Sequence, residues 1–257
     1  MRINCSVPAT SFPGSYLQLL FGALMLAMLS PVSATDSQPY PEFEAVYDVR
    51  VNGFPIAEAS FGLHQLDNGD FIYQQKSTPV GIASFLGEKA SSASSRWRFT
   101  NNRIQALEYR SSKEDGDADD NLHLIFNWET AYVENVSTAG PWQTRMPEDT
   151  LDKLVMQMAL LFELREGMTE FRYPVAHEGR IKQYRFKQNG KEKVALSMGE
   201  YDTLIVERLD EDRDNSKIWS APELNYFPVR FLTIKQSGME IELSLRKLEF
   251  VGVEVSH

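Results

Sequence analysis

The residue types that most often do chemistry are sparse in this sequence and lie far from one another. The histidines His64, His123, His177 and His257 are widely separated, and the single cysteine, Cys5, lies close to the start of the chain. Zinc and haem sites need such ligands in clusters. The sequence therefore predicts no metal site, no cofactor and, once a leader is removed, no thiol or disulfide.

One acidic stretch resembles a calcium loop. Asp115, Asp117 and Asp119 occupy the first three ligand positions of an EF-hand, but Asp120 stands where the turn glycine belongs and Phe126 where the closing glutamate belongs. These departures exclude an EF-hand. A solvated acidic loop is the preferred interpretation, and weak calcium binding is the alternative.

The small residues at 90–95 include four serines. A serine nucleophile needs a base that a third group orients, and nothing nearby in the sequence supplies one. We therefore expect this run to be a strand against which a helix packs closely. Phosphate-binding and dinucleotide-binding glycine patterns are absent, so no catalytic residue is predicted.

Residues 147–166 are predicted to form the only long helix of the mature chain. Pro147 suits a first turn, Asp149 and Asp152 favour its positive end, and Gly167 can adopt the left-handed conformation that ends a helix. One apolar stripe at helical spacing comprises Leu151, Leu154, Val155, Met158, Leu161 and Phe162, whereas Asp152, Lys153, Gln157 and Glu163 lie opposite. The pattern predicts an amphipathic helix at the centre of the fold.

Three apolar residues, Met156, Leu160 and Leu164, interrupt the polar side of this helix about one turn apart. The preferred interpretation is that strands or a loop cover this side as well. The alternative is an apolar cleft, which makes these residues candidate ligand contacts.

A second candidate surface is the aromatic group Trp219, Tyr226 and Phe227, close to the segment between Pro222 and Pro228. Aromatic side chains give a large contact area at little entropic cost. The alternative, which we prefer, is that they close one end of a barrel.

The remainder of the mature chain predicts a dozen or so short strands. Asn52-Gly53, Asn68-Gly69, Asn189-Gly190 and Ser237-Gly238 mark turns between them. So many antiparallel strands must hide their edges. We therefore predict a mainly β fold, an antiparallel meander curled into a barrel-like or spiral sheet that wraps around the one long helix, with residues 35–257 forming a single domain.

Residues 1–34 are typical of a secretory signal peptide. Arg2 precedes the apolar run at 17–29, and Val32-Ser33-Ala34 is a small-residue cleavage site. The run is too short to cross a bilayer, so a periplasmic protein without a transmembrane segment is expected, cleaved near Ala34. The formal net charge of −10 and the lack of a basic cluster argue against binding to nucleic acid.

Four segments resemble a bacterial envelope family known as the domain of unknown function 3108. They are NGFPIAEA at 52–59, LLFELR at 160–165, YRF at 184–186 and WSAPELNYFPVR at 219–230. The resemblance spans nearly all of the mature chain and implies an envelope location but no activity, cofactor or site. A sheet curled around a helix also looks like the periplasmic carriers of lipoproteins, which bind acyl chains in their concavity, although fold alone is weak evidence for function.

Three functional hypotheses follow. The leading one is a non-catalytic periplasmic protein that binds a lipid-like, apolar or amphipathic ligand between sheet and helix. The second is a scaffold with a filled core that binds an envelope protein partner through a sheet edge or the 222–228 loop. The third is a hydrolase of cell-wall glycan, since folding can bring two carboxylates together across a cleft.

Overall fold

A computed structural model describes residues 40–116, 121–137, 140–209 and 214–251. The expected signal peptide, residues 1–34, lies outside the described residues. The described strands, in chain order, are β1 (Phe43–Val51), β2 (Phe54–Gln65), β3 (Phe71–Pro79), β4 (Ser91–Thr100), β5 (Arg103–Lys113), β6 (Leu122–Asn127), β7 (Tyr132–Asn135), β8 (Trp142–Arg145), β9 (Glu170–His177), β10 (Arg180–Leu196), β11 (Gly199–Arg208), β12 (Asn215–Ala221), β13 (Phe227–Ile234) and β14 (Glu240–Phe250). The helices are α1 (Gly81–Phe85), α2 (Val155–Arg165) and the 3-10 helix η2 (Pro222–Leu224).

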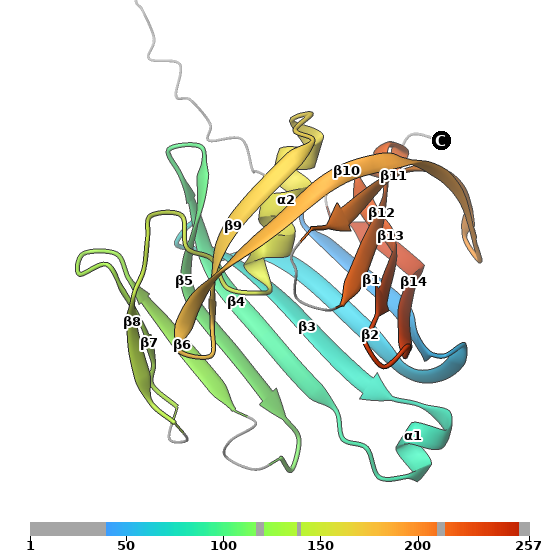
Figure 1. The fold of residues 1–257 in the computed structure, drawn as a ribbon, viewed down its shortest axis with the longest axis horizontal. Coiled ribbons are helices and arrows are strands. Elements are labelled where there is room, and N and C mark those ends of the chain that lie inside the picture. The colour runs from blue at the N-terminus through green and yellow to red at the C-terminus, as the bar shows by residue number, and fades with distance from the viewer. Residues whose placement is uncertain (1–39, 117–120, 138–139, 210–213, 252–257) are drawn as a thin grey trace, which may run out of the picture. The chain divides into compact units, whose positions relative to one another are not determined.

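All of these strands belong to one 14-stranded antiparallel sheet, so the predicted meander is confirmed (Figure 1). Its order is β8-β7-β6-β5-β4-β3-β2-β1-β14-β13-β12-β11-β10-β9. Apart from β8 and β9, strands adjacent in sequence pair with each other, and the long-range pairing joins β1 to β14, from Phe43 opposite Phe250 to Val51 opposite Ile241. The first and last strands therefore lie at the middle of the sheet, and β8 and β9 are its two edges.

The predicted turns are correct at three of the four positions. Gly53, Gly69 and Gly238 have positive φ and join β1 to β2, β2 to β3 and β13 to β14. The hairpin predicted at Asn189-Gly190 is wrong, because β10 continues through it. Gly190, with φ of 100°, instead permits a bulge at which the register with β11 shifts between Gln188 and Lys191.

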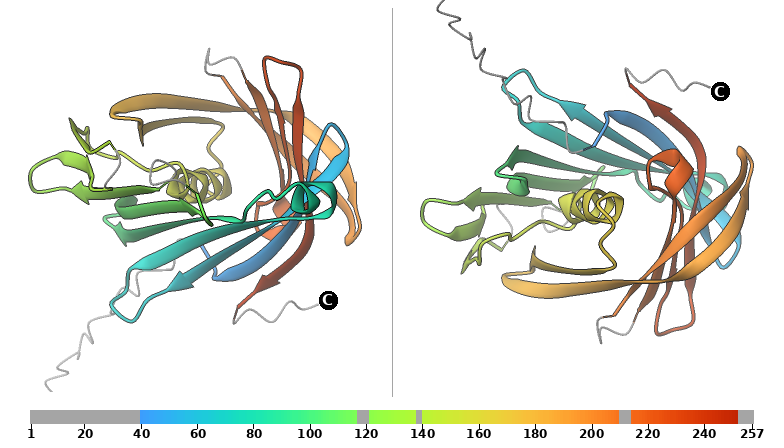
Figure 2. Two further views of the ribbon diagram at one scale, coloured as in Figure 1. Left: turned by 90° about the horizontal axis from the view of Figure 1, so that it is seen from below. Right: turned by 90° about the horizontal axis from the view of Figure 1, so that it is seen from above.

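The sheet curls around α2, which Figure 2 shows nearly end-on with strands from both halves of the sheet around it. This confirms the predicted architecture. Six of its side chains are buried: Val155, Met158, Ala159, Leu160, Leu161 and Leu164. Burial of an aliphatic side chain stabilises by about 1.5–3 kcal/mol before entropy is counted, so α2 is a major part of the core.

The predicted helix boundary at Pro147 is wrong, because α2 begins at Val155. The backbone of Leu151 instead forms a parallel bridge with Val175 of β9. Its amide donates to the Pro174 carbonyl at 2.9 Å, and its carbonyl accepts from the Ala176 amide at 2.9 Å. The segment before α2 therefore covers the edge strand β9 instead of extending the helix.

The opposite edge is also covered. The Thr144 hydroxyl in β8 donates to the carbonyl of Gly179, in the turn between β9 and β10, at 2.6 Å. Gly179, with φ of 75°, also lies beside the ring of Trp142, also in β8. Side-chain contacts thus close the gap between the two edges, where no continuous ladder is formed within the described residues.

Aromatic side chains fill the middle of the core, on the inward face of β1 and its neighbours. Phe43 packs edge-on against Phe227 with ring centroids 4.8 Å apart, and Tyr47 packs edge-on against Phe61 at 5.3 Å. The Tyr47 hydroxyl donates to the Pro228 carbonyl at 2.6 Å. These contacts link the two halves of the sheet around the β1–β14 pairing.

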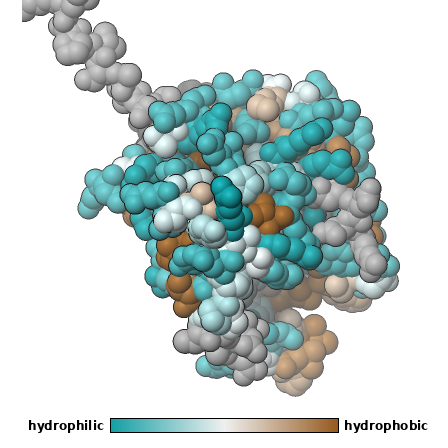
Figure 3. All heavy atoms as spheres, turned by 60° about the vertical axis from the view of Figure 1, so that its left-hand side comes forward, coloured by the Kyte–Doolittle hydropathy of each residue, from teal (hydrophilic) through white to brown (hydrophobic). Residues whose placement is uncertain are grey.

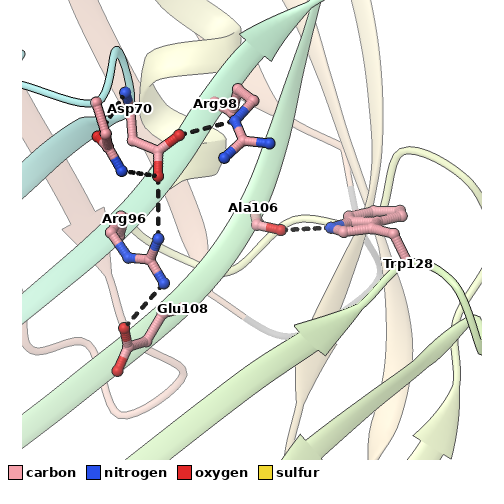
Figure 4. Close-up of polar contacts among 7 residues, drawn as sticks. Asp70, Arg96, Arg98, Ala106, Glu108 and Trp128 are labelled. Carbon is pink, nitrogen blue, oxygen red and sulfur yellow. Dashed lines mark hydrogen bonds and ion pairs between the residues drawn. The ribbon is translucent and has the colours of Figure 1, made fainter.

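The outward face is mainly hydrophilic in the view of Figure 3. On β3–β5 it carries the charged network of Figure 4, in which the fully buried Asp70 carboxylate accepts from Arg96 at 3.0 Å and from Arg98 at 2.8 Å. Arg96 continues to Glu108 at 3.4 Å. Since every carboxylate of this network has a basic partner, we assign it a structural role.

Candidate functional site

A cavity of about 600 Å³ lies between the inward face of β5–β8 and the residues that lead into α2. Its origin is a mismatch of lengths. The eleven residues of α2 extend about 16 Å, whereas a strand of twelve residues such as β2 extends about 40 Å. The helix cannot fill the curl from end to end, and part of the remaining space lies beyond its N-terminus.

The cavity has an apolar side and a polar side. The sheet contributes Tyr109, Leu122, Leu124 and Trp142, together with the side chains of Ser111 and Asn135. The segment before α2 contributes Asp152 and Lys153, and the end of β9 contributes Ala176, His177 and Glu178. This lining suits a ligand with an apolar body and a polar end.

Asp152 is the most enclosed charged group of the cavity, with no exposed surface. Its Oδ1 accepts from the backbone amides of Leu154 at 2.8 Å and Val155 at 2.9 Å, and its Oδ2 accepts from the Ser95 hydroxyl at 2.6 Å. It therefore satisfies the first amides of α2. Burial raises its pKa to about 6, although the hydrogen bonds act in the opposite direction.

Basic groups surround the other side of the cavity. Burial is the largest cause that lowers the pKa of the His177 imidazole; the charge of Lys153 lowers it further, and Lys182 and Arg180 add to this effect. Glu178 acts in the opposite direction but more weakly than Lys153. The potential at this imidazole is therefore positive.

The ligand contacts predicted from the sequence, Met156, Leu160 and Leu164, do not line this cavity. Leu160 and Leu164 are 3% and 1% exposed, and Met156 is partly buried against the core. A ligand could reach Leu160 or Leu164 only if α2 moved. Their surroundings agree with the interpretation that the sheet also covers the second side of the helix.

The three aromatic candidates do not form one surface. Trp219 shares the face of Arg230 on β12–β13 but is 4% exposed, because the Arg230 guanidinium covers its ring at 4.9 Å while its indole donates to Glu192 at 2.7 Å. Phe227 points into the core at 2% exposure. Tyr226 is partly buried beside it.

Two other hollows lie elsewhere on the described part of the molecule. A groove of about 620 Å³ crosses β2–β6 and is paved by hydroxyl groups, including Ser60, Ser94 and Ser112. A hollow of about 440 Å³ lies on the other side of α2, where the Tyr173 hydroxyl donates to Glu163 at 2.7 Å. The cavity before α2 differs from both in being lined by a fully buried carboxyl group, that of Asp152.

The proposed calcium ligands Asp117 and Asp119 lie outside the described residues. Among the residues that are described, no group of three or more His, Cys, Asp or Glu side chains could hold a metal ion. Within the same part of the chain, no helix has the length and apolar character needed to cross a membrane.

Sequence reasoning missed the cavity for a specific reason. Asp152 and Lys153 fell on the polar side of the predicted helix, and neither was a candidate ligand contact. Asp152 lies two residues before Leu154 and three before Val155, whose amides need an acceptor at the start of the helix. This spacing is the signal that could have identified it. Nothing local marks Tyr109 or Trp142, which only the curl of the sheet brings to the site.

Fold and site together define a β-barrel-like protein with an internal helix and an amphipathic cavity. The chain belongs to the family described as Protein of unknown function (DUF3108), whose model matches residues 46–244. A comparison with curated proteins gives no match.

Solved structures of other proteins match this chain. The chain is similar to a beta-barrel-like protein of domain of unknown function DUF1849 from Brucella abortus, with a TM-score of 0.56 and 9% identity, covering 83% of this chain and 99% of that one. This likeness shows the fold alone. A putative outer membrane lipoprotein-sorting protein domain from Vibrio parahaemolyticus aligns with a TM-score of 0.23 and 11% identity, covering 84% of this chain and 88% of that one.

The raised pKa of Asp152 predicts a pH-dependent stability. Between about pH 4 and 6 the folded protein holds this proton and the unfolded chain releases it, so stability falls as the pH rises through this window and is level above it. The fall attributable to Asp152 is about 3 kcal/mol for a pKa shift of about two units. Asp152→Asn, which keeps an acceptor for the helix amides, should remove this fall in urea denaturation at pH 4, 5 and 7.

Asp48→Asn is the control, since Asp48 is an exposed carboxylate paired with Arg246 at 3.1 Å. Its pH profile should follow that of the wild type. Parallel profiles for wild type and Asp152→Asn would contradict the assignment of a buried, proton-binding Asp152.

Proposed function

We propose that this protein is a non-catalytic periplasmic binder of an apolar or amphipathic, lipid-like ligand, held between the curled sheet and α2. The observation that carries the proposal is the cavity of about 600 Å³ beside the N-terminus of the helix. Its size lies within the range of small-molecule sites, about 300–1,000 Å³. The periplasmic location rests on the signal-like residues 1–34.

The lining supports an amphipathic ligand. Leu122, Leu124 and Trp142 offer apolar area from adjacent strands, and burial of apolar surface supplies about 25 cal/mol per Å². The Ser111 hydroxyl can hydrogen-bond a polar group beside this wall, whereas the Asn135 amide is held by Ser137 and Gly140. The ligand would lie against the sheet, with its polar end toward the segment that precedes α2.

The close packing around α2 also favours a ligand site ahead of the helix. Leu160 and Leu164 pack in the interior, so in this proposal they hold α2 in place. Of the three helix residues predicted as ligand contacts, Met156 lies nearest to the end of α2 that adjoins the cavity, one turn after Lys153.

Filling the cavity should remove the ligand. Ser111 lines the cavity and Ser112, the next residue, is exposed on the other face of β5. Ser111→Phe should reduce the fraction of lipid-bound protein about tenfold in native mass spectra of protein purified from the periplasm, a loss of about 1.4 kcal/mol. Ser112→Phe is the matched control and should retain the bound lipid. Equal spectra for the two variants, or a wild type with no bound lipid, would contradict the proposal.

A second candidate function, binding of an envelope protein partner, is favoured by one observation. Four exposed apolar side chains gather where α1 adjoins the start of β2: Phe54, Ile82, Phe85 and Leu86 are 70%, 65%, 88% and 73% exposed. The Val80 amide holds α1 there by donating to the Ile56 carbonyl at 2.8 Å. α1 projects at the lower end of Figure 1, where hydrophobic atoms also gather in Figure 3.

Crosslinking in cells tests this second function. A photoreactive p-benzoylphenylalanine in place of Phe85 should give one discrete product that Ile82→Asp reduces about tenfold or more, because a charge in an apolar interface costs at least about 1.4 kcal/mol. The same crosslinker in place of Met239, which is 37% exposed, is the control. Identical products at both positions, or no effect of Ile82→Asp, would exclude α1 as a docking surface.

A further inference from the structure

The charge distribution around the cavity allows the class of ligand to be narrowed. The chain as a whole is acidic, with a formal net charge of −10. The cavity departs from this average, since Lys153 and His177 line it and Lys182, Arg180 and Arg208 act on them electrostatically from β10 and β11. Two basic residues therefore line the cavity, and the cations of β10 and β11 add to the positive potential there.

Lys153 is the basic group best placed to bind a ligand. It follows the capping residue Asp152 directly, lies exposed at the edge of the cavity and forms no ion pair within the described residues. Partial desolvation is the largest cause that lowers the pKa of its ammonium, and Glu178 is the charge that most opposes this effect. An anion that enters the cavity would meet an ammonium that lacks a close counter-ion.

Asp152 and Glu178, the two acidic residues of the cavity, do not oppose the binding of an anion equally. Asp152 is engaged by the Ser95 hydroxyl and by two amides of α2, so its charge is directed toward the helix terminus. Glu178 is 71% exposed, and its Oε1 lies 3.6 Å from His177 Nε2. Glu178 is therefore the group with which an anionic ligand would compete.

We infer that the ligand is an anionic amphiphile, whose carboxylate or phosphate head is bound by the Lys153 ammonium and accepts a hydrogen bond from the neutral His177 imidazole, while its chain lies along Leu122, Leu124 and Trp142. This inference rests on the proposed function and specifies the ligand of the same cavity. The aromatic and aliphatic wall alone would accept a neutral chain equally well, so the charge of Lys153 is the source of selectivity.

The test compares three probes of equal chain length: dodecanoate, dodecyl phosphate and dodecanol. Each is titrated by calorimetry into the mature protein after extraction of co-purified lipid. Lys153→Gln should weaken binding of the anionic probes at least about fivefold, the effect of about 1 kcal/mol expected for a partly exposed charge pair, and should change dodecanol binding less than about twofold. Glu178→Gln should act in the opposite direction and strengthen binding of the anions about twofold or more.

Lys187→Gln is the matched control, because Lys187 lies on β10 and pairs with Glu170 at 3.1 Å, and it should leave all three affinities unchanged. Dodecanoate and dodecyl phosphate separate a fatty-acid head from a phospholipid-like head, and a response of either one to Lys153→Gln supports the inference. If all probes bind the wild type and neither Lys153→Gln nor Glu178→Gln alters the anion affinities, the inference fails and the proposed function stands. If no probe binds, both fail.

Discussion

The structure depends on the position of α2 in the chain. The sheet has two edges, β8 and β9, and α2 lies in the connection between them. Exposed edges of a large sheet are prone to pair with other chains. Because the connection starts at one edge and ends at the other, it can cover the gap, with Leu151 bridging Val175 and the helix filling the interior.

This arrangement accounts for both the filled and the hollow parts of the interior. Around α2, buried aliphatic and aromatic side chains leave no place for a ligand beside Leu160 or Leu164 without movement of the helix. Ahead of α2, the chain forms turns and a single bridge to β9 instead of a helix, and a cavity lies between it and the inward faces of β5–β8. Asp152 lies where the two parts meet, since it lines the cavity and its carboxyl accepts from the amides at the start of the helix.

Much of the fold could be predicted from the sequence, and the failures have physical causes. Alternation and turn residues are local, so the strands and most hairpins were predictable. Pro147 and Asp149 look like a helix start, but Asp149 has φ of 66° and Leu151 pairs with β9, and only tertiary contact decides this. Similarly, an Asn-Gly pair permits either a hairpin or a bulge, and at Gly190 the neighbouring strand β11 selects the bulge.

The site was less predictable than the fold. The sequence indicated that any ligand would lie between sheet and helix, but the face that a side chain takes depends on bulges, such as the one between Trp219 and Ser220 that shifts the register with β13. Trp219 and Phe227 consequently point to opposite faces. Tyr109 and Trp142 meet Lys153 only because β5 and β8 curve toward the start of α2.

Photolabelling with a diazirine-bearing hexadecanoic acid, followed by peptide mapping, tests the central claim most directly. Label on peptides that contain Tyr109, Leu122, Leu124 or Trp142 is the result we expect, because these residues face the space between the sheet and the segment before α2. Label confined to α1 and Phe54, or spread evenly over the surface, would contradict a ligand site inside the curl.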